Sequence, residues 1–282
     1  MNRNKILKKL HTIEKIPTMF NIALKLEKIV NKEDTTIEMV TDLIKFDPAL
    51  TSKIMKIANS ATYASTRRII NLNEIVSRLG FSEIRKIALS VSVMNIFQNN
   101  YVNYSRFWTH SITTAYIAEE LLSYSNVSKK KGNIFACGML HDIGVMILDQ
   151  YFSKIYKKVF ELTKKKKVDL HFIEKKALGI DHAEVGGILL KKWNVPTILH
   201  ETVRYHHEPW EKEGIDYKDV LYLANFICNN QGYDNGTGIF PDHFYDDIWI
   251  NLGLEMDCVP KILEDVEKEV KTAKQLIKLG SF

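Results

Sequence analysis

The spacing of apolar residues is the feature that most constrains how this chain folds. Along most of its 282 residues they recur at intervals of three and four, and no alternating series competes with them. That period places apolar side chains on one face of an α-helix, whereas a half-buried strand requires alternation. The chain also has only 13 glycines and 6 prolines, so breaks between elements are few. We therefore predict an all-α, multi-helical fold.

A polar stretch at residues 98–105 divides the predicted helices into two groups. Asp47 followed by Pro48 is typical of a helix start, and Gly80 is typical of a helix end. We expect an N-terminal helical subdomain in residues 1–104. Residues 105–282 are then expected to form a helical bundle with a C-terminal helical extension. The helices expected across the two groups lie at about 21–30, 36–46, 48–59, 72–80, 82–97, 107–124, 134–148, 153–166, 170–177, 183–193, 196–206, 217–229 and 259–279.

The composition is that of a globular protein without disulfides. Apolar residues make up 45% and charged residues 26% of the chain, close to the average for such proteins. Cys137, Cys228 and Cys258 are odd in number and far apart, which favours buried thiols in a reducing compartment. No stretch has the roughly 18 apolar residues of a membrane span, and the first residues lack the apolar core of a signal peptide. We expect a cytoplasmic protein with no membrane span.

The charge of the chain gives little indication of a partner. The net charge of +5 comes from interspersed lysine and glutamate residues, with one concentrated run at Lys164–Lys167. This run ends an amphipathic segment, where cations favour the negative end of the helix dipole. We interpret it as a solvated helix end, and nucleic acid is not expected as a partner.

Histidines gather in the second group of helices, close to acidic residues. Neutral imidazoles and carboxylates are the usual ligands of Zn, Fe and Mn, and a helical bundle can direct them inward from several helices. The five histidines concerned are His110, His141, His182, His206 and His207. The histidines interpreted as surface residues are His11, His171, His200 and His243.

His141 and Asp142 are neighbours within the apolar sequence GMLHDIGVMIL. On one helix their side chains would diverge by about 100 degrees, which suits two groups that touch different sides of an ion or of a metal pair. A buried charge needs a partner or a metal, so Asp142 is a candidate bridging ligand. The alternative is a buried, hydrogen-bonded pair of Asp142 and a histidine with no metal role.

Several separated motifs along the chain occur in the same order as in a known superfamily. LHDIG, with FWTHS at 107–111, DHAEVGG at 181–187 and RYHHEP at 204–209, resembles the HD phosphohydrolase superfamily. Three N-terminal motifs resemble, more specifically, the HDOD family of bacterial signalling proteins. They are IPTM at 16–19, IKFDPALTSKIMKIANSATY at 44–63 and LNEIVSRLGFSEIRKIAL at 72–89.

The resemblance implies a ligand set for a metal ion, expected to be Fe, Mn or Zn, with a metal-free cluster as the alternative. The family's last ligand is an Asp on a later helix, but Asn225 occupies that place in DVLYLANFIC. An Asn carbonyl can bind a hard cation, yet it brings no negative charge. The implied ligands are His110, His141, Asp142, His182 and His206, with His207 and Asn225 as weaker candidates.

Two further departures bear on catalysis. Val145 stands in HDIGV where hydrolytic relatives often carry a lysine, and Arg106 stands where some carry a Glu ligand. The resemblance therefore implies a cytoplasmic regulatory module of signal transduction that acts by binding or scaffolding, with a degenerate metal-type site. A protein of a signalling pathway is the expected partner, and a nucleotide is a further candidate ligand. The alternative is a metal-dependent phosphohydrolase acting on a nucleotide or phosphoester, in which a metal-bound water attacks phosphorus.

Overall fold

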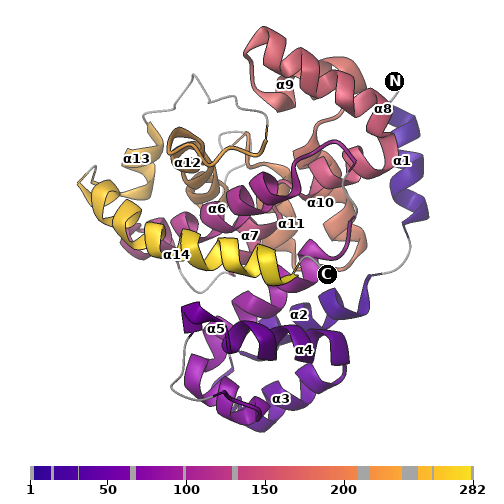
Figure 1. Cartoon of the computed structure of the whole chain (residues 1–282). Coiled ribbons are helices and arrows are strands. Elements are labelled where there is room, and N and C mark those ends of the chain that lie inside the picture. The colour runs from indigo at the N-terminus through magenta and orange to yellow at the C-terminus, as the bar shows by residue number, and fades with distance from the viewer. Residues whose placement is uncertain are drawn as a thin grey trace. The chain divides into compact units, whose positions relative to one another are not determined.

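The computed structural model describes residues 3–13, 16–30, 32–63, 68–97, 100–128, 133–208, 216–236, 247–255 and 257–280. Within these ranges the regular elements are helices and no strand occurs (Figure 1). The predicted all-α fold is confirmed. None of the helices in the described ranges combines the length and the low charge that a membrane crossing requires.

Contacts between residues divide the chain into two compact units. The N-terminal unit comprises residues 15–96 and 271–282, and the histidine unit comprises residues 1–14 and 97–270. The expected division into residues 1–104 and 105–282 stays a prediction, because contact density does not test whether either part folds alone.

The N-terminal unit is built from short amphipathic helices with clear start signals. Thr36 accepts a hydrogen bond from the Met39 N–H at the start of one helix, and Asp47 accepts two at the start of the next. Gly80 has a φ of 78°, so it interrupts the last helix where the sequence predicted an end. The elements are α2 (Thr18–Ile29), α3 (Ile37–Lys45), α4 (Pro48–Ala58), the short 3-10 turn η1 (Ala61–Tyr63) and α5 (Leu72–Met94).

The histidine unit surrounds the predicted ligand residues with helices. The helix that carries His110 packs against α7 and α12, and α10 packs against α8 and α11. The elements are α1 (Arg3–Thr12), α6 (Tyr104–Tyr124), α7 (Ile134–Leu140), α8 (Ile143–Lys166), α9 (Leu170–Leu178), α10 (His182–Lys192), α11 (Thr197–Arg204), α12 (Asp216–Asn230) and α13 (Asp247–Leu252). A last helix, α14, runs from Cys258 to Gly280, and its residues are divided between the units.

One predicted helix assignment is wrong, and two helices were missed. The expected helix at 134–148 ends at Leu140, and α8 begins at Ile143, so the His141–Asp142 pair lies between two helices. Two helices, α1 and α13, were not predicted at all. α13 has only six residues, and α1 is mostly polar and buries only Ile6 and Leu10. Neither shows a clear hydrophobic period.

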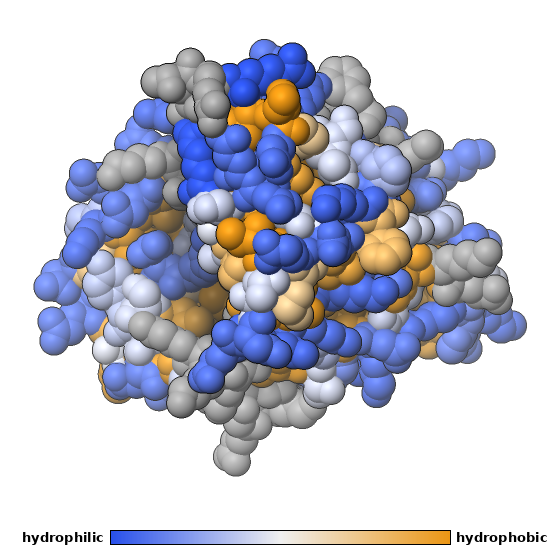
Figure 2. Space-filling model, turned by 90° about the horizontal axis from the view of Figure 1, so that it is seen from below, coloured by the Kyte–Doolittle hydropathy of each residue, from blue (hydrophilic) through white to orange (hydrophobic). Residues whose placement is uncertain are grey.

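Apolar side chains of both units fill the interior, as the helical period requires. The largest fully buried residues include Trp108, Tyr156 and Tyr217 in the histidine unit and Phe20 in the N-terminal unit. Figure 2 shows one face of the molecule, where hydrophilic residues cover most of the surface and hydrophobic residues are visible between them. The three cysteines are buried free thiols, as predicted.

A buried carboxylate fixes the segment that leads into α6. Asp149 of α8 is 0% exposed and accepts hydrogen bonds from the N–H groups of Asn100 (2.6 Å), Tyr101 (3.0 Å) and Val102 (3.3 Å). These donors offset the cost of burying a charge. The start of α6, and with it the approach to His110, is thereby tied to the helix that begins with Asp142.

Candidate metal centre

The centre is built around the turn between α7 and α8. His141 follows the last residue of α7, Asp142 precedes the first residue of α8, and both side chains are at most 1% exposed. The start of α8 lies very close to α10 here. A Cβ atom on Gly144 would lie 1.9 Å from the backbone oxygen of His182. Glycine at 144 therefore allows Asp142 and His182 to meet.

One half of the cluster is formed by His110, His141 and Asp142. The Nε2 atoms of His110 and His141 lie 3.1 Å apart. Asp142 Oδ2 lies 3.6 Å from the first and 3.4 Å from the second. These three residues come from α6 and from the turn after α7, and their ligand atoms all lie within 4.8 Å of one another.

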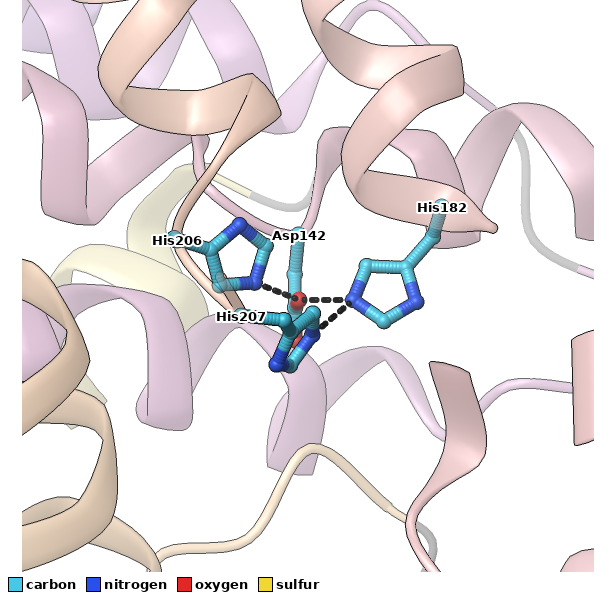
Figure 3. Close-up of side chains that lie close together, drawn as sticks. All are labelled: Asp142, His182, His206 and His207. Carbon is cyan, nitrogen blue, oxygen red and sulfur yellow. Dashed lines mark hydrogen bonds and ion pairs between the residues drawn. The ribbon is translucent and has the colours of Figure 1, made fainter. Parts of the chain in front are cut away.

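The other half places three histidines around the second oxygen of Asp142 (Figure 3). His182 Nε2 lies 3.0 Å and His206 Nε2 lies 3.7 Å from Oδ1. His207 Nε2 lies 2.9 Å from His182 Nε2. Asp142 is thus the one residue that both groups of potential ligands share.

The backbone and one carboxylate set the orientation of the imidazoles. The Nδ1 atoms of His110, His141 and His206 donate to the carbonyl oxygens of Tyr233 (2.6 Å), Gly138 (2.7 Å) and Val203 (2.7 Å), respectively. His182 Nδ1 donates to Glu174 Oε2 at 2.6 Å. A carbonyl oxygen only accepts, so Nδ1 holds the proton, and Nε2 of a neutral ring then presents a lone pair. The Nε2 atoms of all four rings face the carboxylate of Asp142.

This arrangement fits a metal ion better than it fits a network of hydrogen bonds. His206 Nε2 is buried without a hydrogen-bond partner among the described residues. Two ligands bound about 2.1 Å from one ion and at right angles to each other lie about 3.0 Å apart. The His110–His141 and His182–His207 nitrogen pairs, at 3.1 and 2.9 Å, have that separation. The buried His and Asp groups could therefore hold a metal.

The pKa shifts at the centre reflect burial among facing charges. Burial lowers the pKa of His110 to about 4, and His141 beside it acts in the same direction. Burial likewise lowers the pKa of His206 well below its ordinary value. Burial opposes a charge on Asp142, but His141 and His182 hold the pKa of its carboxyl well below the usual range. His182 behaves differently: burial opposes its charge too, yet Glu174 and Asp142 raise its pKa well above normal.

The structure adds supporting residues that the sequence did not indicate. Glu174 of α9 accepts from the His182 ring and backbone, and Tyr156 donates to the same carboxylate. His171 was predicted to be a surface residue, which is wrong. It is 7% exposed and stacks on His207, with ring centroids 4.2 Å apart. A carboxylate partner such as Glu174 fixes a ligand ring and raises its basicity. Glu174, Tyr156 and His171 lie on other elements than the rings they contact, so no local motif indicates them.

The remaining predicted residues have distinct surroundings. Asn225, a weaker ligand candidate, is 9% exposed, and its side-chain oxygen accepts from Asn229 at 2.9 Å. Val145 is fully buried. His200, also predicted at the surface, is 6% exposed, so that prediction is wrong because α11 packs its face inward. His11 is exposed as predicted, and His243 lies outside the described residues.

Comparison with known proteins gives one family match and several similar folds. The sequence profile of the HDOD domain matches residues 16–209. A Treponema pallidum protein is 24% identical over 215 residues, which are 76% of this chain and 42% of that protein. This chain thus spans less than half the length of that relative.

Among solved structures, a Geobacter sulfurreducens HDOD domain protein of unknown function has a TM-score of 0.77 and 21% identity, with 98% of this chain and 96% of that chain covered. A Marinobacter aquaeolei protein, provisionally described as a signal transduction protein, has a TM-score of 0.80 and 19% identity. The match covers 99% of this chain and 66% of that chain. A Shewanella amazonensis protein, provisionally described as a phosphohydrolase, has a TM-score of 0.73 and 22% identity, covering 97% of each chain. At these identities the likeness shows the fold alone.

Proposed function

We propose, since this chain belongs to the HDOD domain family, that it is a cytoplasmic regulatory module of signal transduction which acts by binding or scaffolding. Its histidine cluster would hold an ion, Fe, Mn or Zn, in a structural or sensing role. The residues that would hold it are His110, His141, Asp142, His182 and His206, with His207 at the edge of the second group.

The burial of the ligand atoms is the observation that carries this proposal. His110, His141, Asp142, His182 and His206 are each at most 1% exposed. In structural metal sites protein ligands fill the coordination sphere, whereas catalytic sites keep a coordination position open to water or substrate. The closed cluster supports ion binding without turnover.

Two further side chains support the same conclusion. Val145 offers an apolar, fully buried side chain where a lysine would be needed to hold a phosphate. Asn225 brings no negative charge, and its amide is engaged by Asn229. A phosphate group would therefore meet little complementary charge from these two positions.

A signalling protein is the partner we propose, with a nucleotide as a further candidate ligand. Support comes from the family itself and from the Marinobacter aquaeolei protein of similar fold, whose description names signal transduction.

Metal analysis of the purified chain, combined with an activity panel, tests this function. We expect close to stoichiometric Fe, Mn or Zn, lost in His141→Ala and kept in His11→Ala, whose histidine is exposed. We also expect no turnover of nucleotides or phosphoesters by the loaded protein. Turnover that His141→Ala abolishes and His11→Ala preserves would overturn the proposal.

Turnover that depends on His141 would instead support a second function, that of a metal-dependent phosphohydrolase. One observation favours it: Asp142 is shared by two groups of potential ligands, the arrangement of a two-metal site. Bound ions would supply Lewis-acid chemistry and an activated water. Protein that stays free of metal after reconstitution would exclude this second function.

A further inference from the structure

The turn at residues 232–236, which we call the closing turn, lies against the first half of the cluster. His110 donates to the Tyr233 carbonyl, and Arg106 of α6 pairs with Asp234. The Asn235 amide nitrogen lies 3.0 Å from Asp142 Oδ2, to which it donates. Three consecutive residues of one turn therefore contact the helices that carry the ligands.

The closing turn is held in place by its own contacts. Asp234 is 3% exposed, and its Oδ1 accepts from the Gly236 N–H at 2.8 Å while its Oδ2 faces Arg106. The thiol of Cys228 at the end of α12 contacts the Tyr233 oxygen at 3.4 Å. Asn235 thus reaches Asp142 from an anchored backbone.

Asn225, by contrast, is occupied within its own helix. Its side-chain oxygen accepts from Asn229, one turn further along α12. The amide that donates to Asp142 is that of Asn235, ten residues further along the chain.

We propose, on the premise that the cluster binds an ion as argued above, that Asn235 supplies its amide oxygen as a ligand beside His110, His141 and Asp142. The 3.0 Å between the Asn235 amide and Asp142 Oδ2 equals the separation of about 3.0 Å expected for two neighbouring ligands on one ion. Half a turn of the amide exchanges its nitrogen and oxygen, so either atom fits this position.

The ligand set of His110, His141, Asp142 and Asn235 suits a divalent transition-metal ion. Two imidazoles, a carboxylate and an amide oxygen form a mixed nitrogen and oxygen set with no thiolate. Oxygen ligands suit Mn²⁺, while imidazoles suit Fe and Zn. Asn235 then replaces the oxygen ligand that the family carries on α12, but without its negative charge.

Two substitutions at position 235 give opposite results if the side chain is a ligand. Full-length, metal-stripped protein is titrated with Mn²⁺, followed by the EPR signal of the free ion, and with Zn²⁺ against a chromogenic chelator. The comparison uses the ion that the wild-type chain binds more tightly. We expect Asn235→Ala to weaken binding at least tenfold and Asn235→Asp to tighten it severalfold, because a carboxylate ligand adds charge.

Asn230→Ala is the matched control. Its amide donates to the Phe226 carbonyl at the exposed end of α12, so its affinity should equal that of the wild type.

Weaker binding by Asn235→Asp would overturn the inference, since it would mean that Asn235 only donates to Asp142 and that a second carboxylate repels it. Unchanged binding by Asn235→Ala would overturn it as well. Wild-type protein that binds neither ion would overturn the proposed ion binding itself. The wild type alone tests whether the chain binds an ion, and the variants at position 235 test whether Asn235 is a ligand. The two proposals can therefore fail separately.

Discussion

At the scale of single residues, the centre depends on which ring nitrogen carries a proton. Three imidazoles are oriented by backbone carbonyls, whereas His182 is oriented by the buried carboxylate of Glu174. Burial raises the pKa of that carboxyl, and His182 opposes the rise. A charged partner increases the basicity of a ligand ring more than a carbonyl does.

Glu174→Gln is therefore expected to weaken metal binding by about 10- to 100-fold, the usual effect of removing such a partner. Affinity is measured by competition with a chelator of known strength. Glu161→Gln provides the control, because the Glu161 side chain is 55% exposed. Equal affinities for the two variants would contradict the role given to Glu174.

The stability of the metal-free protein should depend on pH through His110. Its unfolded ring takes up a proton below about pH 6.5, but the folded ring resists until about pH 4. Stability is therefore lost as pH falls through that window, by up to about 3 kcal/mol. Urea unfolding of wild type and His110→Gln at several pH values measures the difference.

For His182→Gln, the difference in unfolding free energy from the wild type should change with pH in the opposite direction. Because the folded pKa of His182 is raised, its stabilisation is complete below about pH 6.5 and disappears as pH rises through the folded value. Parallel pH profiles for both variants and the wild type would argue against these assignments.

The sequence identified the centre of this site but not its surroundings. His110, His141, Asp142, His182, His206 and His207 were singled out from motifs, and the structure brings them together. Whether they bind metal stays a prediction. Glu174, His171 and Asn235 were missed because they reach the centre from other elements, and tertiary contacts of that kind leave no local pattern.

At the scale of elements, the break between α7 and α8 determines how the pair His141 and Asp142 is presented. The sequence predicted most helices near their observed places, because the apolar period and caps such as Asp47 are local signals. It predicted a continuous helix through His141, because GMLHDIGVMIL is apolar on both sides of the His141–Asp142 pair. The break lies where α8 packs against α10, and a single sequence does not express such tertiary contacts.

Gly144→Ala should strongly destabilise this junction. The added Cβ would lie 1.9 Å from the backbone oxygen of His182, so α8 or α10 must shift. We expect a loss of about 3 kcal/mol or more in the free energy of unfolding, together with weaker metal binding. Calorimetry and metal titration measure the two effects.

Gly186→Ala is the matched control for that change. A Cβ there would meet side-chain atoms at 3.1 and 3.3 Å, which can adjust by a few tenths of an ångström. Its loss should be clearly smaller, and an equal loss would mean that backbone proximity at 144 is not the cause.

At the scale of the whole molecule, all the potential ligands belong to the histidine unit. An ion bound there stabilises the structure that holds it, by mass action. Amide hydrogen exchange should therefore slow in α6, α7 and α10 when metal is added, while α2, α3 and α4 exchange as before. Equal protection of both sets would show that ion binding is transmitted to the N-terminal unit.

The use of backbone carbonyls to orient three of the imidazoles affects how the site tolerates mutation. The carbonyls of Val203 and Tyr233 keep their positions when the side chains at those residues change, provided that the fold is retained. Substitutions such as those at 145 and 225 can then accumulate around the cluster without releasing its rings. The arrangement of the histidines can therefore persist when the residues around it change.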